Sequence, residues 1–247
     1  MIISDFDGTL LRTDGTISAE TKSAIDGYIA AGGTFGICTG RMTGSILPRA
    51  KELGLKGLVS SYQGSVITDI ESGKLLVDGY IPAENAAEIC RVFEGLNLHT
   101  HVYTLDEFFV NRQDEALEMY ENVCKVKGNV VTDEPLSSFV LKKGFKVRKV
   151  LAMVYPEEKK RIFGIVSEAL GDKFYVTYSA ASLVEITSRQ YSKGTAVRFM
   201  ADYYGVPVEK TIAAGDSLND LPMLEAAGLG IAVKNADEAL KDKALAF

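Results

Sequence analysis

Six side chains in short polar motifs of this 247-residue sequence are of types that bind metal ions and anions. They are Asp5, Asp7, Thr39, Lys193, Asp216 and Asp220. Four carboxylates, shared between two predicted strand ends, can bind a hard cation that prefers oxygen ligands. A hydroxyl, backbone N–H groups and one ammonium can bind a phosphoryl group. Together these residues predict a magnesium phosphotransfer site.

Alternating strands and helices precede and follow this set of residues. Near the N-terminus the pattern predicts strands at 1–3, 34–38 and 58–61, separated by helices at 19–31 and 44–53. After Ser192 the same rhythm returns, with helices at 194–204 and 218–227 and strands at 211–214 and 229–233. Strands that alternate with helices favour a parallel sheet, so we predict an α/β fold.

The middle of the chain has a different pattern. Residues 66–69 and 74–79 flank Glu71-Ser72-Gly73, which is a hairpin signal. Helices and strands then alternate without the regular parallel rhythm. We therefore expect an inserted α+β cap domain at 81–187, and a discontinuous core domain formed by 1–80 and 188–247.

The predicted strand ends carry the candidate site. In open parallel sheets, ligands bind beyond the carboxyl ends of the strands. Asp5, Thr39 and Asp216 each follow a predicted core strand. If these strands are neighbours, the three side chains converge on one small volume, as a catalytic site requires.

Composition excludes several classes of partner. A net charge of −6 and a pI near 5.1 disfavour binding to nucleic acid, which depends on clustered Lys and Arg. There is no basic leader and no apolar stretch near the ~20 residues of a membrane span, so we expect a cytoplasmic protein without membrane contact. Three widely spaced cysteines suggest no disulfide framework. We expect a monomer or weak dimer acting on a small phosphorylated metabolite.

Four ordered motifs carry a resemblance to a known family. They are Asp5-Phe6-Asp7-Gly8-Thr9, Thr39-Gly40-Arg41, Lys193, and Gly215-Asp216 through Asp220. They resemble the motifs of the haloacid dehalogenase-like hydrolase superfamily, and the position of the insertion resembles the Cof-type branch of phosphatases with a type IIB cap. The resemblance implies a Rossmann-like core. One departure is Tyr62-Gln63-Gly64, where this branch often has Asn-Gly.

The resemblance also implies a role for each motif residue. Asp5 would be the nucleophile, and Asp7 would protonate the leaving oxygen and later deprotonate water. Mg²⁺ would be bound by Asp5, the backbone carbonyl of Asp7 and Asp216, with Asp220 supporting it through water. Gly8 would allow a sharp turn, and the Thr9 hydroxyl would close it.

The phosphate would be held by a second group of residues. Thr39 and the N–H of Gly40 would bind phosphoryl oxygens, and Lys193 would neutralise charge shared by Asp5 and the phosphate. Lys193 lies at a predicted helix N-terminus, where the helix dipole disfavours a cation unless an anion is near. Asn219 is placed with the phosphate-binding residues, although it can instead serve only to orient Asp216.

Two further features have simpler interpretations. His99 and His101 share one face of a predicted strand, but no third metal ligand is evident, so we expect substrate-facing cap residues or plain surface. Cys38 ends an apolar strand without the spacing of a cysteine phosphatase, and we expect a buried thiol.

These observations predict a magnesium-dependent phosphatase that works through an aspartyl-phosphate, with sugar phosphates favoured by the resemblance. A phosphomannomutase-like phosphotransferase would use the same site. So would a phosphatase for pyridoxal phosphate, a flavin nucleotide or phosphoglycolate. A phospho-accepting receiver module also uses aspartates, a Thr and a Lys, but such a domain is about half this length and has no insertion.

Overall fold

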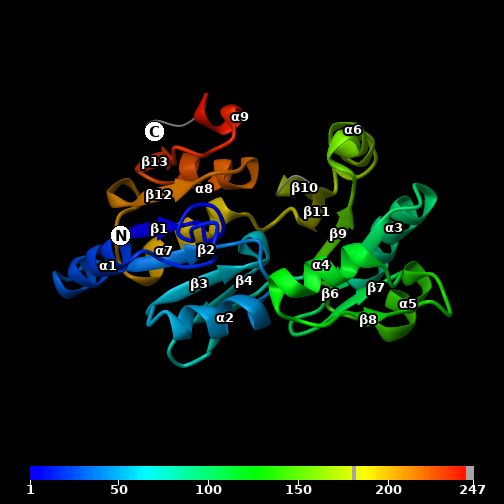
Figure 1. The fold of residues 1–247 in the computed structure, drawn as a ribbon, viewed down its shortest axis with the longest axis horizontal. Coiled ribbons are helices and arrows are strands. Elements are labelled where there is room, and N and C mark those ends of the chain that lie inside the picture. Colours follow the sequence, from blue (N-terminus) through cyan, green and yellow to red (C-terminus); the bar gives the residue numbers. More distant parts are fainter. Residues whose placement is uncertain (180–181, 243–247) are drawn as a thin grey trace. The chain divides into compact units, whose positions relative to one another are not determined.

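The computed structural model describes residues 1–179 and 182–242 and divides into two compact units (Figure 1). The first comprises Met1–Gly40, Ile46–Asp78 and Tyr191–Phe247, and the second comprises Arg41–Ser45 and Gly79–Gln190. The core and cap ranges expected from the sequence include residues 180, 181 and 243–247, which lie outside the described part.

A seven-stranded sheet, counted over the described residues, forms the centre of the first unit. Its strands lie in the order β13-β12-β1-β2-β3-β4-β5. Their bounds are β1 Ile2–Ser4, β2 Phe35–Cys38, β3 Leu58–Ser61, β4 Val66–Asp69, β5 Leu75–Asp78, β12 Ile212–Gly215 and β13 Leu229–Ala232. The pairs from β13 to β3 are parallel, which confirms the predicted parallel sheet. Strands β4 and β5 pair antiparallel, as the hairpin signal predicts.

Helices cover both faces of this sheet because successive strand residues point to opposite sides. Ile3, Cys38 and Leu58 pack in one buried cluster with residues of α7 (Lys193–Tyr203) and α8 (Leu221–Ala226). The neighbouring positions Ile37 and Val59 pack in a second cluster with α1 (Ala19–Ala30) and α2 (Thr43–Glu52). Both faces of the central strands are therefore apolar, as an α/β sheet requires. The chain continues past β13 into the short helix α9 (Glu238–Lys241).

The second unit contains a six-stranded sheet, again counted over the described residues, in the order β10-β11-β9-β6-β7-β8. Its strands are β6 His99–Tyr103, β7 Phe108–Val110, β8 Asn129–Val130, β9 Lys149–Met153, β10 Phe174–Ser179 and β11 Leu183–Ser188. Helices α3 (Ala83–Gly95), α5 (Leu136–Lys143) and α6 (Lys159–Leu170) share a hydrophobic core with one face of this sheet. This unit is the α+β insertion that the sequence predicts, so the fold-class prediction is confirmed.

Two elements of the second unit were missed from the sequence. They are β8 and α5, which lie between α4 (Glu115–Cys124) and β9. Helix α5 has signals at both ends, because Pro135 precedes it and Gly144 follows it in the left-handed conformation, with φ of 62°. Its eight residues are too few for a clear apolar period, and packing against α3 stabilises it instead.

A similar correction applies to the helix predicted at 218–227. It is divided into a 3-10 turn, η4 (Leu218–Asp220), and α8. Pro222 lies in the first turn of α8, where its missing N–H removes no hydrogen bond of the helix.

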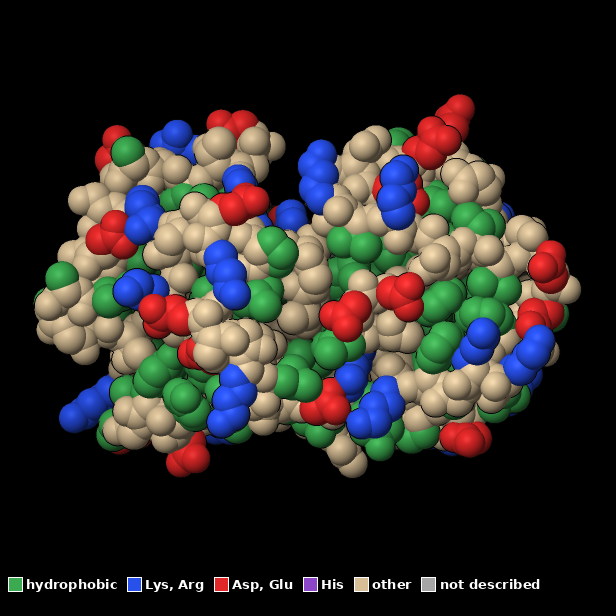
Figure 2. All heavy atoms as spheres, turned by 90° about the horizontal axis from the view of Figure 1, so that it is seen from below, with side chains coloured by type: hydrophobic (Ala, Val, Ile, Leu, Met, Phe, Trp, Pro, Cys, Tyr) green, Lys and Arg blue, Asp and Glu red, His purple; other side chains and the backbone are tan. Residues whose placement is uncertain are grey.

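Charge is mixed on the surface of both units. On the face shown in Figure 2, Lys and Arg side chains are interspersed with Asp and Glu side chains. Across residues 1–179 and 182–242, no helix combines the length and the apolar character needed to cross a membrane.

Candidate active site

Three of the predicted site residues follow neighbouring strands of the first unit. Asp5 follows β1, Thr39 follows β2 and Asp216 follows β12, and the sheet order places β1 between the other two strands. Main-chain hydrogen bonds continue the ladder beyond the strands, from Asp5 N–H to Ala214 O at 2.9 Å and from Thr39 N–H to Ser60 O at 2.9 Å. The strands that carry Asp5, Thr39 and Asp216 are therefore neighbours, which is the condition that the expected convergence requires.

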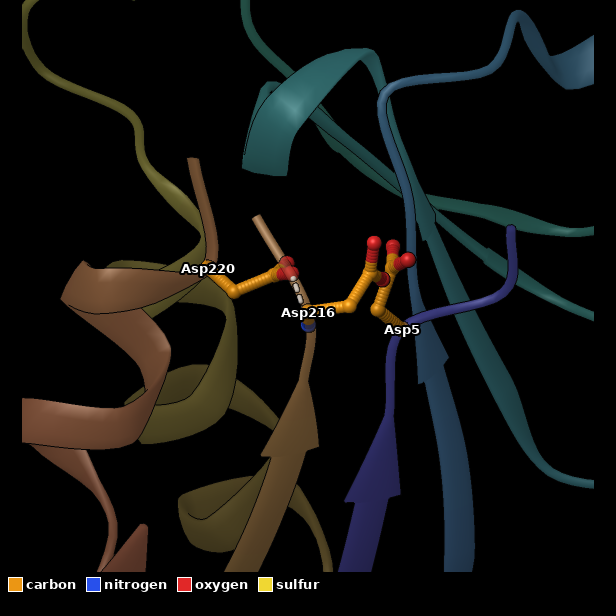
Figure 3. Close-up of side chains that lie close together, drawn as sticks. All are labelled: Asp5, Asp216 and Asp220. Carbon is orange, nitrogen blue, oxygen red and sulfur yellow. Dashed lines mark hydrogen bonds between the residues drawn. The ribbon is translucent and has the colours of Figure 1, made fainter. Parts of the chain in front are cut away.

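Asp5, Asp216 and Asp220 form an acidic cluster (Figure 3). Each contributes one carboxylate oxygen, and these oxygens all lie within 4.8 Å of one another. Asp5 and Asp220 are buried and Asp216 is half-buried. Three oxygen donors this close suit a hard divalent cation.

The turn after β12 fixes Asp220 in this cluster. Its Oδ2 accepts hydrogen bonds from the backbone N–H groups of Asp216 at 2.9 Å and Ser217 at 3.0 Å. A Cβ on Gly215 would lie only 2.4 Å from the Cβ of Asp220, so a larger residue at position 215 would displace the carboxylate. The motif therefore needs glycine at position 215 for a steric reason, in addition to the carboxylates of Asp216 and Asp220 that it needs for chemistry.

Lys193 lies between two of these carboxylates. Its Nζ donates to Asp5 Oδ1 at 2.6 Å and to Asp220 Oδ1 at 2.5 Å, and its side chain is 1% exposed. Burial by itself would lower the pKa of Lys193, but Asp220 and Asp5 outweigh it and raise the pKa above its ordinary value. Lys193 is the first residue of α7, so the two carboxylates are the anions expected near this helix N-terminus.

The charges of this cluster do not balance. Three carboxylates and one ammonium leave a net charge of −2 (−3 + 1) when all are ionised. Burial raises the pKa of Asp5 well above its ordinary value, against the opposing effect of Lys193. Burial also raises the pKa of Asp216, although the Thr9 hydroxyl opposes the change. An added cation would therefore stabilise the fully ionised cluster. Mg²⁺ has a charge of +2, which equals the excess negative charge, and it prefers oxygen ligands.

The turn after β1 connects to the same cluster. Gly8 has a φ of +79°, and a Cβ there would lie 2.7 Å from Asp216 Oδ2, so the predicted need for glycine is confirmed. The prediction for Thr9 is wrong, because its hydroxyl donates to Asp216 Oδ1 at 2.7 Å instead of closing its own turn. This tertiary contact joins residues 207 positions apart, and local turn patterns carry no signal for it.

Asp7 differs from the other carboxylates. Its side chain is exposed, and it lies outside the acidic cluster identified among the described residues. The backbone of Asp7 forms an isolated bridge with Leu11, which holds the turn close to the end of β1. Asp7 is therefore exposed to solvent, whereas Asp5, two residues earlier, is buried.

Thr39, Gly40 and Asn219 contact a residue that the sequence prediction did not include. Gln63 accepts a hydrogen bond from Asn219 Nδ2 through its Oε1 at 3.2 Å, and its N–H donates to Thr39 O at 3.1 Å. Its Nε2 lies only 2.4 Å from where a Cβ on Gly40 would be. The available signal was the unusual Tyr62-Gln63-Gly64 sequence after β3.

The two histidines of the second unit are buried, so the plain-surface interpretation was wrong, while the substrate-facing one stays a prediction. His99 and His101 are buried, with their Nε2 atoms 3.1 Å apart. His99 Nδ1 lies 3.0 Å from Asp114 Oδ2, and His101 Nδ1 lies 3.1 Å from the Tyr103 hydroxyl. They belong to a polar chain between β6 and α4, whose N-cap is Asp114. Cys38 is buried as expected.

Comparisons with known proteins agree with this geometry. The sequence profile of haloacid dehalogenase-like hydrolases matches residues 2–247. Phosphatase YwpJ of Bacillus subtilis is 30% identical over 262 residues, covering 98% of this chain and 91% of that protein. The same organism's 5-amino-6-(5-phospho-D-ribitylamino)uracil phosphatase YwtE is 29% identical over 263 residues, with 98% and 90% covered.

Solved structures extend the comparison to the fold. A haloacid dehalogenase-like hydrolase from B. subtilis has a TM-score of 0.86 at 28% identity, covering 99% of this chain and 93% of the other. A sugar phosphatase of subclass IIB has a TM-score of 0.85 at 20% identity, covering 99% and 91%. The second likeness concerns the fold alone.

Proposed function

The chain belongs to the haloacid dehalogenase-like hydrolase family and is a phosphoric monoester hydrolase, and we propose that it is magnesium-dependent and hydrolyses small phosphorylated metabolites. The observation that carries the proposal is the acidic cluster of Asp5, Asp216 and Asp220 with Lys193 bound to two of its members. Phosphoryl transfer needs this combination of positioned oxygen ligands and positive charge.

Asp5 is the proposed nucleophile. One of its carboxylate oxygens attacks phosphorus, the bond from phosphorus to the ester oxygen breaks, and an aspartyl-phosphate forms. Water then attacks this intermediate, which restores the Asp5 carboxylate and releases inorganic phosphate. Lys193 supports both steps because its ammonium, fixed on Asp5 Oδ1, offsets negative charge as the phosphate dianion approaches.

Asp7 is the proposed general acid and base. Asp7 is exposed, so its carboxylate can exchange protons with substrate and water. Asp7 would give a proton to the departing alcohol oxygen and then take one from the attacking water. One residue thereby serves both half-reactions, and the proton count closes over the cycle.

Mg²⁺ would be held by Asp5, Asp216 and the backbone carbonyl of Asp7, with support from Asp220. When bound, it supplies positive charge that lets a carboxylate and a phosphate dianion approach each other. Thr39 and the N–H of Gly40 would bind the phosphoryl oxygens, with Asn219 as a further amide donor.

Small substrates, with sugar phosphates favoured, are proposed because YwtE is named for a substrate that carries its phosphate on a D-ribityl chain. We further propose that residues 81–187 act as a cap domain that recognises the organic part of the substrate, while the chemistry stays in the core formed by 1–80 and 188–247.

A phosphate-release screen tests this proposal. It compares kcat/KM for sugar phosphates, nucleotides, pyridoxal phosphate, phosphoglycolate and a phosphopeptide, each with Mg²⁺ and with excess chelator. We expect turnover of small esters that chelator abolishes and added Mg²⁺ restores. Undiminished turnover in chelator would contradict the metal assignment. Isomerised product without free phosphate would indicate the mutase, and equal efficiency on the phosphopeptide would contradict the small-substrate assignment.

A further inference from the structure

The turn after β3 has an unusual backbone. Tyr62, Gln63 and Gly64 form the 3-10 turn η1, with φ values of 51°, 59° and 104°. Positive φ is uncommon for residues other than glycine, and here two such residues are adjacent. Both side chains are fully buried. Strained backbone of this kind persists where surrounding contacts determine it, and it is concentrated at functional sites.

This turn contacts three of the four sequence motifs. The N–H of Gln63 donates to Thr39 O at 3.1 Å, and its Nε2 packs on Gly40 so closely that a Cβ on Gly40 would lie 2.4 Å away. The next residue packs on the third motif, since a Cβ on Gly64 would lie 2.1 Å from Ser192 O and 3.1 Å from Lys193 N. The fourth motif is reached through Asn219.

The Gln63 amide sets the orientation of the Asn219 amide. Asn219 Nδ2 donates to Gln63 Oε1 at 3.2 Å, and Asn219 is 6% exposed. A flipped Asn219 would place two carbonyl oxygens against each other, which is unfavourable in a buried site. In the observed orientation, Asn219 Oδ1 is buried and has no hydrogen-bond partner among the described residues. The cost of leaving that acceptor unpaired indicates that the contact with Gln63 determines the orientation.

We propose that Gln63 is a positioning residue of the phosphate site, an inference that rests on the proposed phosphatase function. Its backbone N–H and the packing of its Nε2 hold the Thr39-Gly40 loop on one side, and its Oε1 holds the Asn219 amide on the other. The amide nitrogen of Asn219 is thereby held by a hydrogen bond to the Gln63 carboxamide, which packs on Gly40. This nitrogen carries a second hydrogen besides the one donated to Gln63. Gln63 therefore couples the Thr39-Gly40 loop to Asn219, which lies 156 positions after Gln63 in the chain.

The variants Gln63→Met and Gln63→Glu test this role. Methionine keeps the length of the side chain but removes the hydrogen bond to Asn219 and the amide nitrogen that packs on Gly40, while the backbone N–H still donates to Thr39 O. Glutamate keeps the acceptor for Asn219 and replaces the donor that packs on Gly40 with an oxygen. Loss of a buried hydrogen-bonding partner corresponds to roughly 5- to 150-fold in an equilibrium or rate. We expect kcat/KM for p-nitrophenyl phosphate to fall by that factor in Gln63→Met, mainly through KM, and inhibition by inorganic phosphate to weaken in parallel.

A double-mutant cycle with Asn219→Ala separates positioning from general stability. If Gln63 acts through Asn219, Gln63→Met should have little further effect on kcat/KM in the Asn219→Ala background. Thr68→Val is the matched control, because Thr68 is equally buried in the adjacent strand β4 and its Oγ1 has no hydrogen-bond partner among the described residues. It should leave kcat/KM unchanged, and melting temperatures report any loss of folded protein.

The outcomes are distinct. If the wild-type protein turns over phosphate esters and Gln63→Met stays within about twofold of it, the positioning role is overturned while the proposed function stands. Additive effects in the cycle overturn the coupling through Asn219. A wild-type protein inactive on every ester overturns the proposed function and this inference with it. If Gln63→Met does not fold, Gln63→Leu, which also lacks the acceptor for Asn219, decides by the same KM and cycle measurements.

Discussion

Replacing Lys193 by methionine should destabilise the protein as well as inactivate it. At an effective dielectric constant of 20, an ammonium 2.6 Å from a carboxylate is attracted by about 6 kcal/mol, and Lys193 has two such partners at 2.6 and 2.5 Å. Burial of the ammonium cancels much of this gain. Removing one partner of a buried ion pair nevertheless lowers the free energy of unfolding by about 3–5 kcal/mol, because the remaining charge is left buried.

Thermal unfolding measures this change directly. A domain of this size loses about 2–4 °C in melting temperature for each kcal/mol, so Lys193→Met should melt about 6–20 °C lower in chelator. Added Mg²⁺ should recover part of the loss, because a cation on Asp5 and Asp216 replaces some of the missing positive charge. Circular dichroism and p-nitrophenyl phosphate turnover can be followed on the same samples.

A surface ion pair supplies the control. Lys142 and Glu134 lie 3.1 Å apart, but the Lys142 side chain is 71% exposed. Such pairs contribute about 0–1 kcal/mol, so Lys142→Met should shift the melting temperature by only a few degrees. A Lys193→Met protein that melts within 2 °C of the wild type would refute the argument that this ammonium compensates two buried carboxylates.

Two other predictions concern the acids of the first motif and the histidines of the second unit. Asp7→Asn should reduce kcat by about 10²–10⁴-fold, and Asp5→Asn should reduce it more because the covalent route is lost. Steady-state kinetics with a poor leaving group measure both effects. If Asp5→Asn were the more active variant, the roles assigned to Asp5 and Asp7 would have to be exchanged. Burial lowers the pKa of His99, and burial with the charges of His99 and Lys149 lowers that of His101 well below 6.5. The unfolded state therefore binds more protons, and stability should fall as pH drops below about 6.5. Melting temperatures between pH 7.5 and 5 should fall less steeply in His101→Asn, and equal slopes would contradict this reasoning.

The sequence by itself predicted the class of chemistry and the parallel strands of the core sheet. Asp5, Thr39 and Asp216 each follow a short apolar run, and alternation with helices implied parallel strands whose carboxyl ends share an edge. Each of these signals is local, because it depends on residue types a few positions apart. Lys193 was placed near the acids for a similar reason, since a cation at a helix N-terminus needs anions close by.

Only the tertiary structure decided which side chains meet across these motifs. The hydroxyl of Thr9 binds Asp216 and the amide of Gln63 binds Asn219, contacts that span 207 and 156 positions. His99 and His101 alternate on a strand as surface residues also do, and they are buried because α4 covers that part of the sheet. Periodicity shows that a side chain points to one face of an element. Packing between distant elements determines what lies against that face, and this depends on the whole fold.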